Sequence, residues 1–452
     1  MTAKLTFCGG AGTVTGANFL LETGTKRVLI DCGAREREHI CDETNFEPFP
    51  YDPASIDMLI VTHAHADHIG RIPKLVRDGF RGEIHSTAAT RDLAELMLDD
   101  ALSVMQTEAE QHGCAVLYER ADIERTFPLW HTHEYHQSFT VNDVTVEFSD
   151  AGHILGSALV RLSRNGRSIL FSGDLGNSPE PLLRDTESAA GVHYMVIESV
   201  YGDRLHEARA ERKEHLRAAI ERTRGQRGVL LIPSFSLERT QILLFELNDM
   251  VESGSMQSIP VYLDAPLATR VTEVFRRYSS LFNTEAVKHF EGDDDPFTFK
   301  GLTVVHHTGE SRALHKEKNP KVIIAGAGMS AGGRIRSHEK QYLDDPLATV
   351  LFVGYQAPGS LGRRLQDGEK KVRIDNEWIR VRAGIDSLTG YSGHADRDQL
   401  LSFIESAGDS LERVFVTMGE PRSSMFLAQR TRDFLDVEAV VPEKGDSHDL
   451  DW

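Results

Sequence analysis

The chain has 452 residues, more than one compact core usually holds, so two domains are expected. Its composition, 40% hydrophobic and 26% charged residues, is that of a globular protein, and no apolar run is long enough to span a membrane. The net charge of −19 argues against broad basic contacts with nucleic acid, although metal ions can supply local positive charge. The four Cys residues lack metal-type spacing and no signal peptide is recognisable, so we expect reduced thiols and a cytoplasmic location.

The first part of the chain alternates short apolar runs with glycine turns, a pattern typical of β-strands. The strands expected from this pattern lie at residues 5–7, 19–21, 28–30, 58–62, 144–148, 168–171 and 194–197. The first three follow one another closely and predict a meander. A polar, aperiodic stretch at 34–56 predicts a long excursion, and apolar residues at helical spacing predict a helix over 89–112.

From about residue 208, expected helices alternate with buried strands, a βαβ rhythm that predicts a largely parallel sheet. The helices are expected at 207–224, 237–252 and 266–280, and the strands at 229–232, 260–263, 322–325 and 350–353. After about residue 373 short strands return, at 373–382 and 413–417, with a helix over 396–406. Sheet segments on both sides of an α/β block indicate an insertion, so we expect a first domain of 1–207 and 373–452 interrupted by a second of 208–372.

The strongest chemical signal is Thr-His-Ala-His-Ala-Asp-His at 62–68, directly after a buried strand. His63 and His65 are two residues apart and can point the same way, and Asp67 and His68 follow at the start of the next helix. Imidazole and carboxylate groups are ligands that suit zinc first. A single histidine is usually structural, but so many crowded polar groups are costly when unpaired. The motif therefore predicts a metal site.

Three further candidates obey one positional rule. Asp31, His153 and Asp174 each come just after the end of an expected strand, where several strands can present side chains to one cleft. Taken singly, Asp174 reads as a turn residue and His153 as a loop histidine between glycines. Their shared placement with the 62–68 motif favours a common metal site.

These motifs, in this order, resemble those of the metallo-β-lactamase superfamily, and specifically its β-CASP branch of RNA-processing nucleases. The resemblance extends over essentially the whole chain. The segments that carry it are Asp31, HAHADH (63–68), AGHILGSA (151–158), FSGDLG (171–176), IESVYGDR (197–204), PSFSLERTQILL (233–244), YLDAPLATRVTEVFRRY (262–278), AGAGMSAGGR (325–334), VGYQAPGSLGRRL (353–365) and GYSGHAD (390–396). It implies an α/β protein, an αββα sandwich with an inserted β-CASP domain.

The resemblance also implies two zinc ions and a ligand set. One zinc would be held by His63, His65 and His153 and the other by Asp67 and His68, with Asp174 bridging the two. The family's motifs A and B correspond to Glu198 and His394, so His394 would be the general acid and Glu198 its partner. Asp31 would orient a ligand or the metal-bound water, and Asp67 would serve in catalysis as well as in metal binding.

Substrate contacts are expected from the inserted domain. Ser330 and Arg334 lie in and next to a glycine-rich loop that permits close approach of a phosphate chain, and Ser392 is expected to hold another phosphate. The implied partner is single-stranded RNA rather than a membrane. Because members of the family often form dimers, the resemblance also suggests a homodimer.

One position departs from the family pattern. The family's last motif has a histidine ligand of the second metal before Gly-Glu, whereas this chain has Met418 there. A thioether is a poor zinc ligand beside imidazole, so the second metal should bind more weakly. The leading hypothesis is a zinc-dependent ribonuclease. The first alternative is an RNA-binding subunit with weakened or lost cleavage, and Met418 supports it. The second is a metallo-hydrolase of small molecules, but this function would not explain the motifs of the inserted domain.

Overall fold

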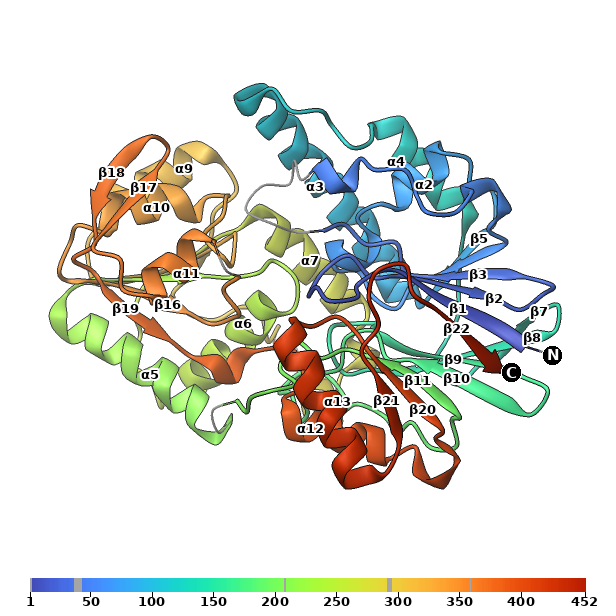
Figure 1. Ribbon diagram of the computed structural model, residues 1–452. Helices are drawn as coiled ribbons and strands as arrows, with labels where there is room; N and C mark the ends of the chain where they lie inside the picture. The colour runs from blue at the N-terminus through green and yellow to red at the C-terminus, as the bar shows by residue number, and fades with distance from the viewer. Residues whose placement is uncertain (1, 36–42, 207–208, 291–294, 358) are drawn as a thin grey trace. The chain divides into compact units, whose positions relative to one another are not determined.

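The computed structural model describes residues 2–35, 43–206, 209–290, 295–357 and 359–452 (Figure 1). The chain forms two compact units, one of residues 1–205 and 394–452 and the other of residues 206–393. The insertion of one α/β unit into another, predicted from the sequence, is confirmed. Among the described residues no helix is both long and apolar enough to cross a membrane. The expected cytoplasmic location stays a prediction.

The first unit contains two seven-stranded sheets. The first sheet has the order β22 (Ser447–Asp451), β1 (Thr2–Gly9), β2 (Asn18–Glu22), β3 (Arg27–Ile30), β4 (Met58–Ile60), β5 (Glu83–Ser86) and β6 (Trp130–Thr132). The second has the order β21 (Glu438–Val440), β20 (Arg413–Val416), β11 (Tyr194–Ile197), β10 (Arg167–Phe171), β9 (Ala158–Arg164), β8 (Val144–Asp150) and β7 (Phe139–Val141). The predicted meander is β1–β2–β3, whose neighbours pair antiparallel.

The apolar inner faces of the two sheets pack on each other. Their shared core contains Phe7 and Phe19 from the first sheet and Phe148 and Phe171 from the second. The helices over the first sheet are α1 (Ala66–Ile69), α2 (Ile72–Arg77), α3 (Ala88–His112) and α4 (Arg120–Thr126), and those over the second are α12 (Arg397–Glu405) and α13 (Pro421–Leu435) (Figure 1). This is the predicted αββα sandwich, in which each sheet buries both of its faces.

The second unit is built on a six-stranded sheet in which every neighbouring pair is parallel. Its order is β14 (Leu302–Val304), β13 (Val261–Asp264), β15 (Lys321–Ala325), β12 (Val229–Pro233), β16 (Ala348–Phe352) and β19 (Gly384–Ser387). The helices of this unit are α5 (Arg209–Gln226), α6 (Arg239–Glu252), α7 (Pro266–Arg277), α8 (Thr284–Phe290), α9 (Thr308–Ala313), α10 (Ile335–Tyr342) and α11 (Leu361–Gln366). The predicted parallel sheet is confirmed.

The structure differs from the expected boundaries at the end of the insertion. The segment 373–393, expected in the first domain, belongs to the second unit. There β17 (Lys371–Ile374) and β18 (Glu377–Arg380) form a hairpin, and β19 adds a parallel strand to β16, with Val350 opposite Ile385. Residues 36–42 of the expected excursion and 207–208 of the expected helix lie outside the described residues.

The cysteines also differ in part from expectation. Cys8 and Cys32 are free and buried, as reduced thiols should be. Cys114, however, is disulfide-bonded, so the expectation of four reduced thiols is wrong at this position.

Candidate metal centre

The ends of several strands meet at one edge of the sandwich. In the first sheet β3 and β4 are parallel, and in the second β10, β11 and β20 are parallel. Strand β8 runs in the same direction as β10, because both pair antiparallel with β9. The predicted residues follow the carboxyl ends of these strands, with Asp31 after β3, His63 after β4, His153 after β8, Asp174 after β10 and Glu198 after β11.

Four of the predicted zinc ligands, His63, His65, His153 and Asp174, form a cluster that we call the four-ligand group. His65 Nδ1 lies 3.1 Å from His63 Nε2 and 3.2 Å from His153 Nε2. Asp174 Oδ2 lies 3.4 Å from His63 Nε2 and 3.5 Å from His153 Nε2. Bonds of about 2.0–2.1 Å to a tetrahedral zinc place ligand atoms roughly 3.3 Å apart, so the spacing fits zinc.

Asp67, His68 and Asp174 make a second cluster, which we call the three-ligand group. His68 Nε2 lies 3.3 Å from Asp174 Oδ1 and 3.8 Å from Asp67 Oδ2. Both His68 Nε2 and Asp174 Oδ1 are buried and have no hydrogen-bond partner among the described residues. Buried polar atoms without partners are costly, and a shared cation would satisfy both. Asp174 belongs to both groups, and its two oxygens face different ones.

Asp31 and Thr62 fix the orientation of His68. Asp31 Oδ2 lies 2.7 Å from His68 Nδ1, so the carboxylate holds the imidazole proton on that nitrogen and leaves Nε2 free to bind. Asp31 is itself held by Thr62, whose backbone N–H and hydroxyl each donate to it at 2.8 Å. Sequence reasoning assigned no role to Thr62. Its position beside the first motif histidine was the only available signal.

The electrostatics of the two groups differ. Burial lowers the pKa values of His65 and His153 well below the usual range, and neighbouring imidazoles add to the effect, so their lone pairs are available to a metal. Burial also disfavours charge on His68, but Asp174, Asp31 and Asp67 together raise its pKa well above the usual value. Carboxylates that stabilise a proton there would equally stabilise a divalent cation. The residues present therefore fit a pair of zinc ions.

Glu198 and His394 lie next to the ligand groups. His394 precedes α12 and is held beside Gly176 by a β-bridge. Its Nδ1 lies 3.1 Å from Glu198 Oε1, which also accepts the backbone N–H of Leu175 at 2.7 Å. Burial alone would lower the pKa of His394, but the Glu198 carboxylate, and Asp174 beyond it, raise it to about 9. The pair thus favours a protonated imidazole at the edge of the candidate centre.

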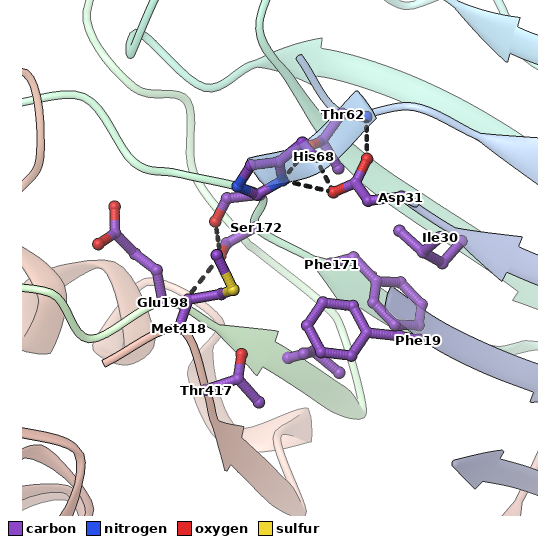
Figure 2. A pocket seen from close by; sticks show the side chains of 12 residues that line it. Phe19, Ile30, Asp31, Thr62, His68, Phe171, Ser172, Glu198, Thr417 and Met418 are labelled. Carbon is purple, nitrogen blue, oxygen red and sulfur yellow. Dashed lines mark hydrogen bonds and ion pairs between the residues drawn. The ribbon is translucent and has the colours of Figure 1, made fainter. Parts of the chain in front are cut away.

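Met418 lies beside the three-ligand group. Figure 2 shows it among the side chains that line a small cavity, with Asp31, His68 and Glu198 among the polar ones. The volume of this cavity is about 10 Å³. The residue has a positive φ of 44° and belongs to the apolar core between the sheets. A cavity of this volume is near the size that one water occupies. Among the described residues, the three-ligand group has only its two carboxylates and one imidazole.

The three expected phosphate contacts lie in the second unit. Ser330 is fully buried and its hydroxyl donates to Glu339. Arg334 forms an ion pair with Asp264 and donates to the backbone carbonyls of residues 305 and 306. Ser392 is also buried. Ser330 and Arg334 are therefore engaged within their own unit, and the role of all three in binding phosphate stays a prediction.

Comparison with known proteins shows which protein families the chain resembles. Three family models match it in order, namely the metallo-beta-lactamase superfamily (residues 11–234), the Beta-Casp domain (240–365) and the Zn-dependent metallo-hydrolase RNA specificity domain (378–442). Ribonuclease TTHA0252 of Thermus thermophilus is 37% identical over 93% of this chain and 94% of its own length. Transcription termination factor FttA of Methanocaldococcus jannaschii is 31% identical over 98% of this chain and 71% of its own length.

Solved structures agree on the fold. The crystal structure of a protein of unknown function from Enterococcus faecalis V583 superimposes with a TM-score of 0.58 over the whole of both chains. Its 12% sequence identity makes this a likeness of fold alone. With the family models and the two relatives, the conclusion is that the chain belongs to the metallo-β-lactamase superfamily, in its β-CASP branch.

Proposed function

We propose that the protein is a zinc-dependent ribonuclease that hydrolyses phosphodiester bonds in single-stranded RNA. The observation that carries the proposal is the position of Asp174, whose two carboxylate oxygens face two separate ligand groups next to His394. The names of the Thermus relative and of the third matching family model, a ribonuclease and an RNA specificity domain, support RNA as the substrate. The membership in the β-CASP branch supports it as well.

Different residues have different roles in the proposed hydrolysis. Zinc ions, when bound, would neutralise phosphate charge and lower the pKa of a bound water. His394 donates the proton that the leaving oxygen needs, since its imidazole lies beside the two ligand groups with Nδ1 facing Glu198. Glu198 stabilises the protonated form of His394 until transfer. Asp31 keeps the Nε2 lone pair of His68 directed at the three-ligand group.

A second candidate is an RNA-binding subunit with weakened or lost cleavage. Met418 favours it, because a thioether in the core replaces an imidazole ligand of the family pattern. We prefer the nuclease because Glu198 and His394 stay paired beside a complete four-ligand group, and RNA binding alone requires neither.

One assay separates these functions. The zinc-loaded protein is incubated with 5′-labelled and 3′-labelled single-stranded RNA, with and without a chelator, and the products are resolved on a gel. A ribonuclease gives metal-dependent cleavage, whereas a binding subunit shifts the RNA in a native gel without cutting it. Nitrocefin, a β-lactam, is assayed in parallel. Its turnover without RNA cleavage would identify a small-molecule hydrolase and refute the proposal.

A further inference from the structure

Three histidines gather on one face of the first sheet, outside both ligand groups. Strands β5 and β6 are parallel neighbours, and His85 lies directly opposite His131 in their register. His133 comes two residues after His131, so the alternation of a strand places it on the same face. As they stand, these residues form none of the groups of the described residues that could hold a metal ion, all of which contain Asp174. They form a separate group of imidazoles, which we call the edge cluster because β6 is the last strand of its sheet.

The contacts within the edge cluster are close and directional. His85 Nδ1 lies 3.0 Å from His133 Nε2, and the rings of His85 and His131 stack with centroids 5.6 Å apart. On the other side of His85, Nε2 lies 3.3 Å from Glu83 Oε2. Phe139 of β7 stacks on His133 at a centroid distance of 3.6 Å and fixes the plane of that ring. Two ring nitrogens therefore face each other in a partly enclosed setting.

The cluster is arranged for neutral imidazoles. Burial lowers the pKa of His85 to about 3, and His133 and His131 repel a charge on it further. Burial and His131 also lower the pKa of His133. His85 Nε2 is buried and lacks a hydrogen-bond partner among the described residues, although the Glu83 carboxylate is near. Neutral rings at neutral pH keep their lone pairs, which is what metal binding by histidine requires.

We propose that His85, His131 and His133 form a second zinc site, distinct from the centre around Asp174. His85 Nδ1 and His133 Nε2 supply two ligands, and their 3.0 Å separation is close to the roughly 3.3 Å between ligands of a tetrahedral zinc. His131 is exposed and supplies the third by turning its side chain. Glu83 Oε2 lies 3.3 Å from His85 Nε2, on the side of the ring away from the proposed zinc, where a carboxylate behind a zinc-bound histidine lies.

Proton balance agrees with this assignment. Without metal, one proton is shared between His85 Nδ1 and His133 Nε2, and in the tautomer that carries the His85 proton on Nε2 it is His133 that donates. Zinc takes the place of that shared proton, which moves to His133 Nδ1, so the pair stays neutral and releases no proton. Bound zinc would also tie the last strand of the first sheet to Phe139 of the second, through His133.

The test compares zinc stoichiometry in matched variants of the full chain. Protein already loaded at the Asp174 centre is dialysed against rising concentrations of free Zn²⁺, and bound metal is measured by mass spectrometry. The first variant is His131→Gln, chosen because the side chain of His131 is exposed. The second is the double substitution His131→Gln/His133→Gln. The control is His136→Gln, which removes an exposed histidine a few residues along the same segment.

We expect the wild-type protein and the control to bind one more equivalent of zinc than the double variant, with RNA cleavage unchanged in all three. His131→Gln alone should weaken the extra site by about tenfold or more, because three histidine ligands become two. Equal zinc content in the wild type and the double variant would overturn the proposal. So would an equal loss in His136→Gln, since that would indicate general surface binding. Thermal unfolding reports the site independently, because with the Asp174 centre loaded in both proteins, further zinc should stabilise the wild type more than the double variant.

Discussion

The two ligand groups share Asp174 but differ in how completely the chain surrounds a metal. The four-ligand group has three imidazoles and a carboxylate with donor atoms 3.1–3.5 Å apart. The three-ligand group has one imidazole, held by Asp31, and beside it a small cavity lined by Met418. A complete tetrahedral set binds zinc tightly, whereas an incomplete one leaves ligand positions to water.

The difference shows that the orientation of a ligand side chain and the affinity of the site for its metal are determined by different residues. Asp31 and Thr62 fix the orientation of His68, yet Met418 lies beside this group where the family pattern has an imidazole. We therefore expect the centre around Asp174 to hold one tightly bound and one weakly bound zinc. Each of the following substitutions tests that asymmetry, in order of decreasing expected effect.

Replacing Asp174 by Ala should remove a ligand from both groups at once, because one carboxylate oxygen faces each group. We expect both zinc equivalents of the Asp174 centre to be lost and RNA cleavage to fall to the level of a reaction without protein. Bound metal after gel filtration and gel-resolved cleavage measure the two effects. Asp449→Asn, on an exposed position of β22, is the control and should change neither. A variant at 174 that keeps both zinc ions would contradict the bridging role.

Replacing His394 by Ala should separate chemistry from metal binding. Loss of a general acid typically costs about 10²–10⁴-fold in rate, while His394 is outside both the four-ligand and the three-ligand group, so bound zinc should not change. The measurement is single-turnover cleavage of labelled RNA at saturating zinc. Cleavage at the wild-type rate would eliminate the proton-donor role, and loss of zinc would make His394 a ligand instead.

Replacing Asp31 by Asn should act on the three-ligand group alone. An amide NH₂ facing His68 Nδ1 donates to it, which moves the imidazole proton to Nε2 and blocks the lone pair that faces Asp174. Because such partners typically contribute about 10–100-fold to metal affinity, the weak zinc should be lost in that range while the tight zinc stays. Competition with a chelator of known affinity resolves the two equivalents. Equal weakening of the tight and the weak zinc would mean that Asp31 supports the four-ligand group as well as the three-ligand group.

The sequence predicted the parts of this site that depend on local order. His63, His65, Asp67 and His68 are nearly contiguous, and Asp31 directly follows the last residue of β3, so strand direction alone places them at one edge. It could not predict the role of Thr62, because a hydroxyl has many potential partners and its partner here is 31 residues away. The pairing of Glu198 with His394, 196 residues apart, was accessible only through the family resemblance.

The misplaced boundary of the insertion has a similar cause. Strand β19 has the sequence Gly-Ile-Asp-Ser and none of its residues is fully buried, so it lacks the apolar run or alternation that marks a strand. It forms because β16 offers an unpaired edge to a chain segment that passes beside it. Tertiary pairing of that kind leaves no periodic signal in the sequence.

Replacing Met418 by His should reduce the asymmetry between the groups. An imidazole on the cavity beside His68 supplies a ligand in place of a thioether, and we expect the weak zinc to bind about tenfold more tightly. Cleavage at limiting zinc should rise with occupancy. Met418→Leu, which keeps the apolar volume, is the control and should leave zinc binding as it is. If the two variants behave alike, position 418 does not face the second metal.

Replacing Asp150 by Asn should change stability and leave the chemistry intact. Asp150 ends β8 and accepts the backbone N–H of Gly152 at 2.8 Å, at the base of the loop that carries His153 into the four-ligand group. Burial raises the pKa of Asp150 to about 7, with Glu187 adding to the rise. The folded protein therefore holds a proton that the unfolded chain releases at a pH of about 4, and the stability that this provides is lost as pH rises through the folded-state pKa.

The amide of the Asp150→Asn variant cannot ionise but can still accept the same hydrogen bond. The stability of the variant relative to the wild type should therefore increase as pH rises. Between about pH 5 and pH 8 the difference in the free energy of unfolding should grow by about 2 kcal/mol in favour of Asp150→Asn. Urea unfolding at the two pH values measures it, with cleavage at saturating zinc expected to stay within about twofold of wild type because no ligand is touched. A stability difference that does not vary with pH would mean that Asp150 is ionised in the folded protein, and that the loop holding His153 is supported by a charge.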